Sequence, residues 1–442
     1  MPSRRGPSDW QRPLRNAGIL LLGRGLQGVF SVAYLALAAR DLGVTHFGML
    51  VLLHTLVLST AQFCRFQSWQ AIMKFGAEAL EAGDHSFFRR TVAFAFRLDL
   101  ASALVALLLL CGGMPWLVNL LRLSIETDAT ARAYATLVFI AVIGSGPIGV
   151  LRLFDRHDLV SLQSAVEPTV RLFGVLACYH FDGDFSDYLF VWFLATAIGQ
   201  SVSVVLAVRL LRARGLVPDL RTMAGRAESM PGGTWRFVCG TNVNGTLNIS
   251  STQVGVLLCG WLLGPAGAGY YRIASQFADV LVKSSSKLLV PAIYTDMVEL
   301  TARNEPALRR QVVQRSIYVV GIVGSLVLIS FVFAGKFLIT VLVGQEFEPS
   351  YTPMLWLSVA GIVILLGFPF EPLLVASGRL RAVVCTRVAA LAAYASAFYL
   401  LASSLGVVGA AVATTISAAV TTGLFYSFSR ALLGPIQQEK TD

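Results

Sequence analysis

The sequence predicts an all-α integral membrane protein of about twelve transmembrane helices in two six-helix bundles, with both termini in the cytoplasm. Of its 442 residues, 55% are hydrophobic and only 14% are charged, and the mean hydropathy is +0.68. A globular domain carries about 25% charged residues, so this chain cannot cover a water-facing surface. Its apolar residues form runs of roughly 20 or more, long enough to cross a bilayer as helices. Almost nothing remains for a soluble catalytic domain, and we predict neither catalytic residues nor an enzyme.

Twelve apolar runs follow one another along the chain. They cover residues 16–40, 47–69, 91–118, 131–152, 159–180, 187–208, 237–262, 268–294, 316–342, 353–376, 382–404 and 407–429. One long polar connection, with Pro218, Pro231, Gly232 and Gly233, separates the sixth run from the seventh. We therefore expect a cytoplasmic tail (1–15), an N-terminal six-helix lobe (16–208), a cytoplasmic linker (209–236), a C-terminal six-helix lobe (237–429) and a second cytoplasmic tail (430–442).

Basic residues predict the orientation of these helices. Most of the 35 Lys and Arg residues fall in the tails and the even-numbered loops. In or beside the odd-numbered loops lie only Arg40, Arg122, Arg132, Arg272 and Lys336. Cytoplasmic loops of membrane proteins are enriched in Lys and Arg, which places both termini in the cytoplasm. The same rule accounts for the net charge of +10, so no nucleic-acid partner is predicted.

A short glycine motif occurs after the first and after the seventh run. Leu42-Gly43 is followed by Gly48, and Leu263-Gly264, 221 positions later, is followed by Gly269 at the same spacing. Because each half holds an even number of runs, a repeat would relate the halves by an axis near the membrane normal. We expect two similar bundles that face each other across a cavity.

Charged residues inside the runs are candidates for function, because a charge there costs roughly 2.5–3.5 kcal/mol on insertion scales. The basic ones are Arg24, Arg65, Arg97, Arg171, Lys283, Lys287 and Arg387. Arg65 and Arg387 lie near predicted cytoplasmic ends, where long side chains can reach the headgroups. The other five are predicted to line a cavity and bind an anion such as phosphate. Arg171 follows Glu167 by four positions, so an intrahelical ion pair is the alternative there.

Acidic and amide side chains suggest further contacts. Asp99 and Asp279 are candidates for coupling to H⁺ or Na⁺, with plain charge balance as the alternative. In the seventh run, Asn242, Asn244 and Asn248 are candidates for binding sugar hydroxyls, with hydrogen bonds between helices as the alternative. The six cysteines are scattered without a Cys/His cluster, so no metal site and no resident cofactor are predicted.

Several short segments occur in a characteristic order along the twelve runs. They are Ala39-Arg40-Asp41-Leu42-Gly43 with Phe47-Gly48, Gly149-Val150-Leu151-Arg152-Leu153-Phe154-Asp155-Arg156, Gly269-Tyr270-Tyr271-Arg272-Ile273-Ala274-Ser275-Gln276, Pro291, Gly344-Gln345-Glu346-Phe347 and Gly406-Val407-Val408-Gly409-Ala410-Ala411. In these segments the chain resembles the Wzx-type flippases, the polysaccharide transporter branch of the multidrug/oligosaccharidyl-lipid/polysaccharide exporter (MOP) superfamily.

This resemblance implies a flippase of the bacterial inner membrane. Such a protein moves an undecaprenyl-pyrophosphate-linked oligosaccharide, for example an O-antigen unit, to the periplasmic leaflet by alternating access driven by an ion gradient. Its implied partners are the lipid-linked oligosaccharide, membrane lipids and a polysaccharide polymerase complex. Members of the family often carry an acidic residue in helix seven, where this chain has Gln253. That difference argues against cation coupling at this position.

Two other classes of protein remain as alternatives. A drug or small-molecule antiporter of the same superfamily would share the twelve helices but would favour acidic cavity residues for its cations. A membrane glycosyltransferase or O-antigen polymerase would need an active site, usually on a sizeable outer loop, and the outer loops here are short. Asp182, Asp184 and Asp187 on one of these loops are predicted to be solvated rather than catalytic.

Overall fold

The computed structural model describes the backbone of residues 11–123, 127–219, 222–223, 230, 233–247, 251–302, 306–377 and 379–432. Inside the helices, the side chains of 11–26, 243–247 and 280–302, with a few single positions, lie outside the described part. Within these limits the ordered elements are all helices, and no strand occurs. The predicted all-α fold class is therefore confirmed.

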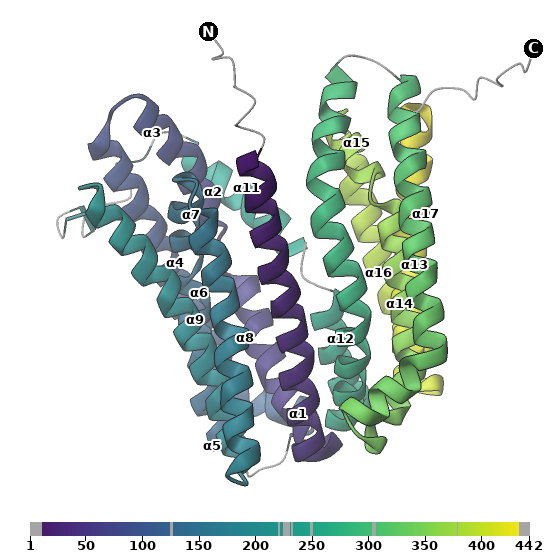
Figure 1. Ribbon diagram of the computed structural model, residues 1–442. Coiled ribbons are helices and arrows are strands. Elements are labelled where there is room, and N and C mark those ends of the chain that lie inside the picture. The colour runs from purple at the N-terminus through teal and green to yellow at the C-terminus, as the bar shows by residue number, and fades with distance from the viewer. Residues whose placement is uncertain are drawn as a thin grey trace, which may run out of the picture. The chain divides into compact units, whose positions relative to one another are not determined.

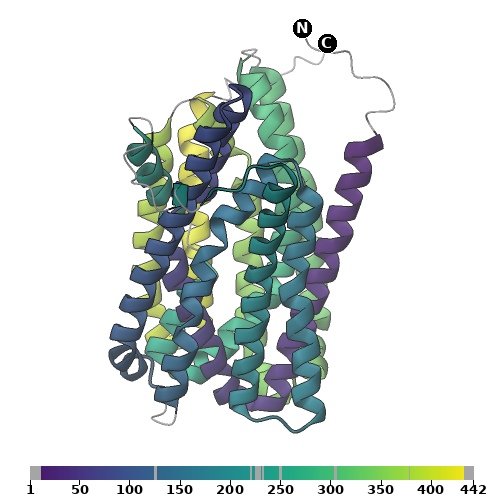
Figure 2. The same ribbon diagram turned by 90° about the vertical axis from the view of Figure 1, so that its left-hand side faces the viewer.

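The chain forms two compact units. Unit 1 comprises Met1–Leu42 and Met49–Leu257, and unit 2 comprises Gly43–Gly48 and Leu258–Asp442. Unit 1 contains most of α1 (Gln11–Cys64), α2 (Ser68–Ala71), the short π-helix η2 (Ile72–Gly76), α3 (Ala77–Glu81), α4 (His85–Leu120), α5 (Thr127–Ala135), α6 (Leu137–Ile143), α7 (Ser145–Leu153), α8 (His157–His180), α9 (Phe185–Ala213), α11 (Thr234–Leu247) and the start of α12 (Ser251–Ala302) (Figure 1). In this unit α8 packs along α9, and α4 packs against α6 (Figure 2).

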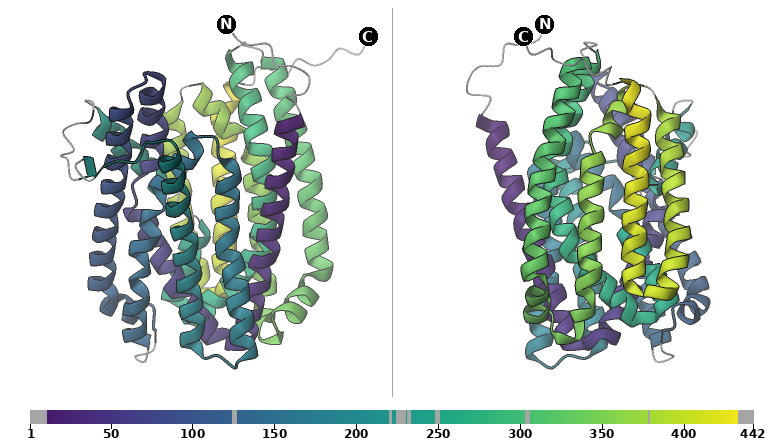
Figure 3. Two further views of the ribbon diagram at one scale, coloured as in Figure 1. Left: turned by 60° about the vertical axis from the view of Figure 1, so that its left-hand side comes forward. Right: turned by 90° about the vertical axis from the view of Figure 1, so that its right-hand side faces the viewer.

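Unit 2 contains the remaining helices. They are the rest of α12, α13 (Pro306–Leu342), the 3-10 helix η4 (Gln345–Ser350), α14 (Tyr351–Gly367), α15 (Phe370–Ala376), α16 (Leu380–Leu405), α17 (Val407–Ser429) and the 3-10 helix η5 (Arg430–Leu432). Helix α17 packs along both α16 and α14, and the right-hand view of Figure 3 shows α16 and α17 side by side.

Each of the twelve predicted runs coincides with one of these helices or with a few consecutive ones. In the part of the chain that the structure describes, nine helical stretches are long and apolar enough to cross a membrane by themselves. Two of them lie on α1 and α12, each of which is interrupted by a glycine and covers two predicted runs or parts of them. Helix α8 is not among the nine, and it carries Glu167 and Arg171 in its middle.

The two interruptions have nearly the same backbone conformation. Gly43 has φ 68° and ψ 175°, and Gly264 has φ 77° and ψ −176°. A positive φ of this kind is strained for a residue with a Cβ atom and costs glycine little. The repeated Leu-Gly motif of the sequence thus marks two equivalent breaks in long helices.

The residues after these breaks pack tightly against each other within unit 2. A Cβ atom on Gly48 would lie 1.9 Å from the carbonyl oxygen of Pro265, and one on Gly269 would lie 3.1 Å from the carbonyl oxygen of Val44. The rings of Phe47 and Tyr270 both contact Phe347 edge-on, with centroids 5.6 and 6.0 Å apart. Three of the segments that carry the family resemblance, those around Gly48, Gly269 and Phe347, therefore meet in one packing cluster of glycines and aromatic rings.

Aspartates start two of the long helices of unit 1. Asp184 accepts hydrogen bonds from the backbone N–H groups of Ser186 and Asp187, and the Asp187 carboxylate accepts one from the N–H of Asp184. This reciprocal capping box gives two of the three acidic residues of that outer loop a structural role. Asp84 caps α4 in a similar way, and the N–H of Phe87 and the hydroxyl of Ser86 lower the pKa of its carboxyl group.

We predict that Gly48→Ala destabilises the protein strongly, because a methyl group at this position meets the backbone of Pro265 and overpacking costs about 1–3 kcal/mol or more. Gly112→Ala in α4 is the matched control, since nothing lies within 4 Å of its Cβ position and alanine favours a helix. Thermal unfolding in detergent should show a large loss of stability for Gly48→Ala and none for Gly112→Ala. Equal stability of the two variants would contradict the packing described.

Candidate functional site

A buried guanidinium group organises the polar interior of unit 1. Arg171, in the middle of α8, has a side chain that is 6% exposed. Its Nη2 atom donates to the Glu167 carboxylate at 2.5 Å and to the Thr196 hydroxyl at 3.1 Å, and its Nη1 atom donates to the Tyr34 hydroxyl at 3.1 Å. The Glu167–Arg171 pair that the sequence allowed is therefore present.

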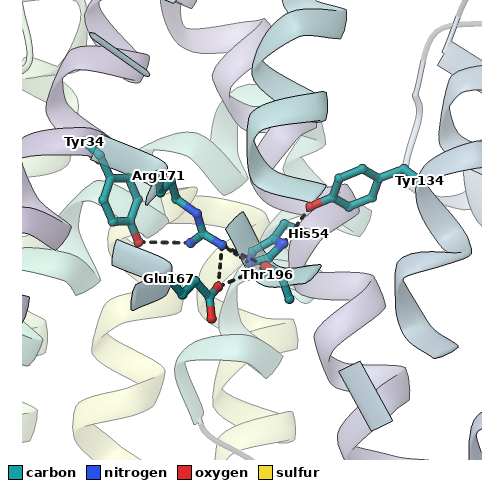
Figure 4. A network of polar contacts seen from close by, with 6 residues as sticks. All are labelled: Tyr34, His54, Tyr134, Glu167, Arg171 and Thr196. Carbon is teal, nitrogen blue, oxygen red and sulfur yellow. Dashed lines mark hydrogen bonds and ion pairs between the residues drawn. The ribbon is translucent and has the colours of Figure 1, made fainter. Parts of the chain in front are cut away.

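A histidine extends these contacts to a further helix. The Nε2 atom of His54 lies 3.4 Å from Arg171 Nη2, and its Nδ1 atom lies 2.7 Å from the Tyr134 hydroxyl. The Thr196 hydroxyl donates to Glu167 Oε1 at 3.0 Å. We call Tyr34, His54, Tyr134, Glu167, Arg171 and Thr196 the Arg171 network (Figure 4). It joins α1, α5, α8 and α9.

Aromatic rings complete the environment of the guanidinium group. Its central carbon lies 5.1 Å from the ring centroids of both Tyr34 and Trp192, within the range of cation–π attraction. The two rings also contact each other edge-on. Glu167 is less enclosed, with 29% of its side chain exposed. The guanidinium group of Arg171 is thus enclosed by protein, whereas the Glu167 carboxylate is partly exposed.

A second buried acid lies where two helices of unit 1 are interrupted. Asp99 in α4 is fully buried. Its Oδ2 atom accepts a hydrogen bond of 2.8 Å from the N–H of Gly146, near the start of α7, whereas no group among the described residues donates to Oδ1. Arg65, in the break between α1 and α2, is close enough to interact electrostatically with it. Asp99 therefore satisfies a helix-start N–H group that α7 itself leaves unpaired.

Arg97 differs from Arg171 in having no partner among the side chains that the structure describes. It lies two residues before Asp99 on α4 and is half-buried. Among the described residues nothing forms a hydrogen bond or an ion pair with its guanidinium group. It is the basic residue among the predicted anion ligands whose side chain is both described and uncompensated.

The other predicted ligands are placed less fully. Arg24 lies on α1, and Lys283 and Lys287 lie on α12, but their side chains are outside the described part, as is that of Asn244. Asn248 lies outside it entirely. Asn242 in α11 is half-buried, and its side-chain oxygen has no hydrogen-bond partner in the described part of the chain. Asp279 in α12 is half-buried and belongs to unit 2, so it does not join Asp99 in a single site of unit 1.

One expectation about surface charges is wrong. Arg387 was expected to extend toward the headgroups, but its Nη2 atom pairs with the Glu371 carboxylate of α15 at 2.5 Å, and its side chain is only 21% exposed. A partner 16 positions away is invisible to helical spacing, which relates only residues three or four apart. Within the described residues no group of three His, Cys, Asp or Glu side chains is placed to hold a metal ion.

The fold of this chain resembles that of known membrane transporters. A multidrug resistance transporter of the MATE family, of the MOP superfamily, solved in an inward-facing conformation, matches with a TM-score of 0.76 over 92% of this chain and 94% of that one, at 12% identity. The lipid II flippase MurJ in an inward closed conformation matches with a TM-score of 0.69 over 93% and 87%, at 9% identity. At such identities the likeness is one of fold: the chain has the fold of MOP-superfamily transporters.

Sequence comparison is more specific. The family model "Polysaccharide biosynthesis protein" matches residues 14–294. Inner membrane protein YghQ of Escherichia coli (strain K12) is 28% identical over 338 residues, which cover 76% of this chain and 94% of that protein. The chain belongs to the polysaccharide biosynthesis protein family, and it is a multi-pass protein of the inner membrane.

Sequence reasoning missed most members of the Arg171 network. It paired Arg171 with Glu167 but not with Tyr34, His54, Tyr134 or Thr196, which come from other helices or from distant parts of the chain. One signal was available: an ionisable histidine at position 54 lies inside an apolar run, and such residues are functional candidates by default.

We predict that Arg171→Met and Glu167→Met each destabilise the protein by about 3–5 kcal/mol, because each leaves a buried charge without its partner. The double variant should lose clearly less than the sum of the two, since no lone charge remains. Arg97→Met, which breaks no pair among the described residues, is the control and should not destabilise the protein, because it removes an uncompensated charge from an apolar run. Thermal unfolding in detergent measures all four, and additive losses would rule out the pair as a structural unit.

We also predict that Asp99→Ala costs about 1–3 kcal/mol, because the buried N–H of Gly146 loses its acceptor. Asp99→Asn keeps an oxygen at that position and should be at most mildly destabilised. The same unfolding measurement compares the two variants. If they prove equally stable, the hydrogen bond to Gly146 does not support the start of α7.

Proposed function

We propose that this protein is a flippase that moves an undecaprenyl-pyrophosphate-linked oligosaccharide across the inner membrane for polysaccharide biosynthesis. The observation that carries the proposal is the match to the polysaccharide biosynthesis protein family over residues 14–294. A transporter fold shared with the lipid II flippase MurJ is consistent with it. Polysaccharide precursors are built on membrane lipids, so a membrane transporter in this family has a lipid-linked sugar as its natural cargo.

The charges inside the apolar runs support an anionic cargo. Arg97 is half-buried and has no partner within the described part of the chain, and Arg24, Lys283 and Lys287 occupy similar apolar runs in the sequence. A guanidinium group in low dielectric attracts phosphate oxygens strongly and can bind two of them at once. In our proposal these residues bind the pyrophosphate, Asn242, Asn244 and Asn248 contact the sugar, and H⁺ or Na⁺ drives alternating access. A polysaccharide polymerase complex would receive the product.

A drug or small-molecule antiporter is the second candidate, because the fold matches a multidrug resistance transporter over 92% of this chain. The two functions predict different phenotypes. Deletion of a flippase leaves its lipid-linked oligosaccharide in the cytoplasmic leaflet, whereas deletion of a drug exporter raises drug sensitivity and leaves the glycolipid unaffected. Accumulation of the glycolipid, restored to normal by the wild-type protein, would decide for the flippase. Drug sensitivity without accumulation would overturn the proposal.

We predict that Arg97→Gln lowers the transport of lipid-linked oligosaccharide by about 10–100-fold, the value of one charge-assisted hydrogen bond to phosphate. Arg97→Lys should retain more activity, because it keeps the positive charge. Arg122→Gln is the matched control, since Arg122 is exposed just after α4. Complementation of the deletion strain, with protein amounts verified, measures the three variants. Full activity of Arg97→Gln would remove Arg97 from the binding site.

A further inference from the structure

The Arg171 network contains more hydrogen-bond acceptors than one nitrogen can serve. Glu167 Oε1, Thr196 Oγ1 and His54 Nε2 all lie within 3.4 Å of Arg171 Nη2, and a guanidinium Nη atom carries two hydrogens. The contact with His54 is the longest of the three and therefore the weakest. One acceptor position on the histidine ring is thus only partly used by the guanidinium group.

The contacts of His54 also define which ring nitrogen carries its proton. Nε2 faces Arg171, which can only donate, so a neutral ring accepts there and carries its hydrogen on Nδ1. Nδ1–H then donates to the Tyr134 hydroxyl at 2.7 Å. In this state the network holds one guanidinium cation and one carboxylate, and its formal charge is zero.

A second proton on the ring would change this pairing. With Nε2 protonated, His54 presents a donor to Arg171 Nη2, which is also a donor, and the two cations repel each other. The Glu167 carboxylate is the acceptor bound to that same nitrogen, and its partly exposed side chain can turn toward either cation. Protonation of His54 therefore weakens the Glu167–Arg171 pair and gives Glu167 a new partner.

We propose that His54, with Glu167 as its counter-ion, is the binding site of a coupling proton in unit 1. Among the described residues, the charged and titratable groups that face His54 are Arg171 and Glu167 from α8 and Tyr134 from α5, with Tyr34 of α1 on the far side of Arg171. Because the network joins four helices, exchange of the Glu167 partner repacks α1, α5, α8 and α9 together. That the bound proton drives transport rests on the proposed function. The binding of the proton to His54 does not, and it can be measured without any substrate.

Trp192 provides a reporter inside the site, because Arg171 stacks on its ring at 5.1 Å. The probe is the proton alone: purified full-length protein is titrated between pH 5 and 8.5, and the Trp192 signal is the difference between its fluorescence and that of Trp192→Phe. We expect a single transition in this range, where histidine changes charge. His54→Gln, which keeps one acceptor and one donor but cannot be charged, should lose it. His180→Gln, at the exposed end of α8, should keep it.

Two further results decide the assignment. Tyr134→Phe removes the hydrogen-bond acceptor of Nδ1–H. The charged ring donates a stronger hydrogen bond to this acceptor than the neutral ring does, so its loss should move the midpoint to lower pH by under about one unit. A transition that belongs to a group other than His54 would show no such shift. A transition that persists in His54→Gln overturns the proposal, because the proton then binds to another group.

The coupling itself is tested in proteoliposomes with an imposed pH gradient. Wild-type transport of the lipid-linked oligosaccharide should accelerate with the gradient, and His54→Gln should lose that dependence. A His54-dependent transition without any effect of the gradient on transport would refute coupling. If no lipid-linked oligosaccharide is transported at all, the proposed function fails, whereas the fluorescence titration still decides whether His54 binds a proton.

Discussion

A peptide group in the hydrocarbon core of a membrane has no water to bind, so the protein must satisfy each one internally. Uninterrupted helices meet this demand by themselves, and the interruptions show how the demand is met elsewhere. At Gly146 a buried carboxylate, Asp99, accepts the N–H group near the helix start. Breaks in the helices are thus tolerated where a side chain or glycine supports them.

The lack of water also means that a charged side chain inside the membrane needs a partner of opposite charge. Arg171 and Arg387 are each bound to a carboxylate at 2.5 Å, and a buried pair of this kind holds its geometry because separation leaves a lone charge. Arg97 lacks such a partner among the described residues. Internal pairing therefore separates basic residues that are already satisfied from one that can still take an anion. The Arg171 network falls between these classes, since a histidine on its edge can alter the pair.

Most residues in the segments that resemble the family do not belong to the candidate site. Gly43, Gly48 and Phe47 belong to a packing cluster of unit 2, and Asp41 accepts a hydrogen bond from the Tyr188 hydroxyl. These residues shape helix breaks that a transporter fold needs whatever its cargo. Because fold alone does not define function, the proposal of a sugar-lipid flippase depends on the family match over residues 14–294 and not on these structural residues.

The sequence by itself determined the membrane class, the twelve apolar runs and the equivalence of Gly43 and Gly264, because each depends on composition or on spacing along one helix. It also offered the Glu167–Arg171 pair as an alternative to an anion site, since four residues span about one helical turn. Only the tertiary structure decided that Tyr34, His54, Tyr134 and Thr196 complete that site and that Glu371 binds Arg387. Those contacts join different helices, and no periodicity along one helix encodes which faces of two helices meet.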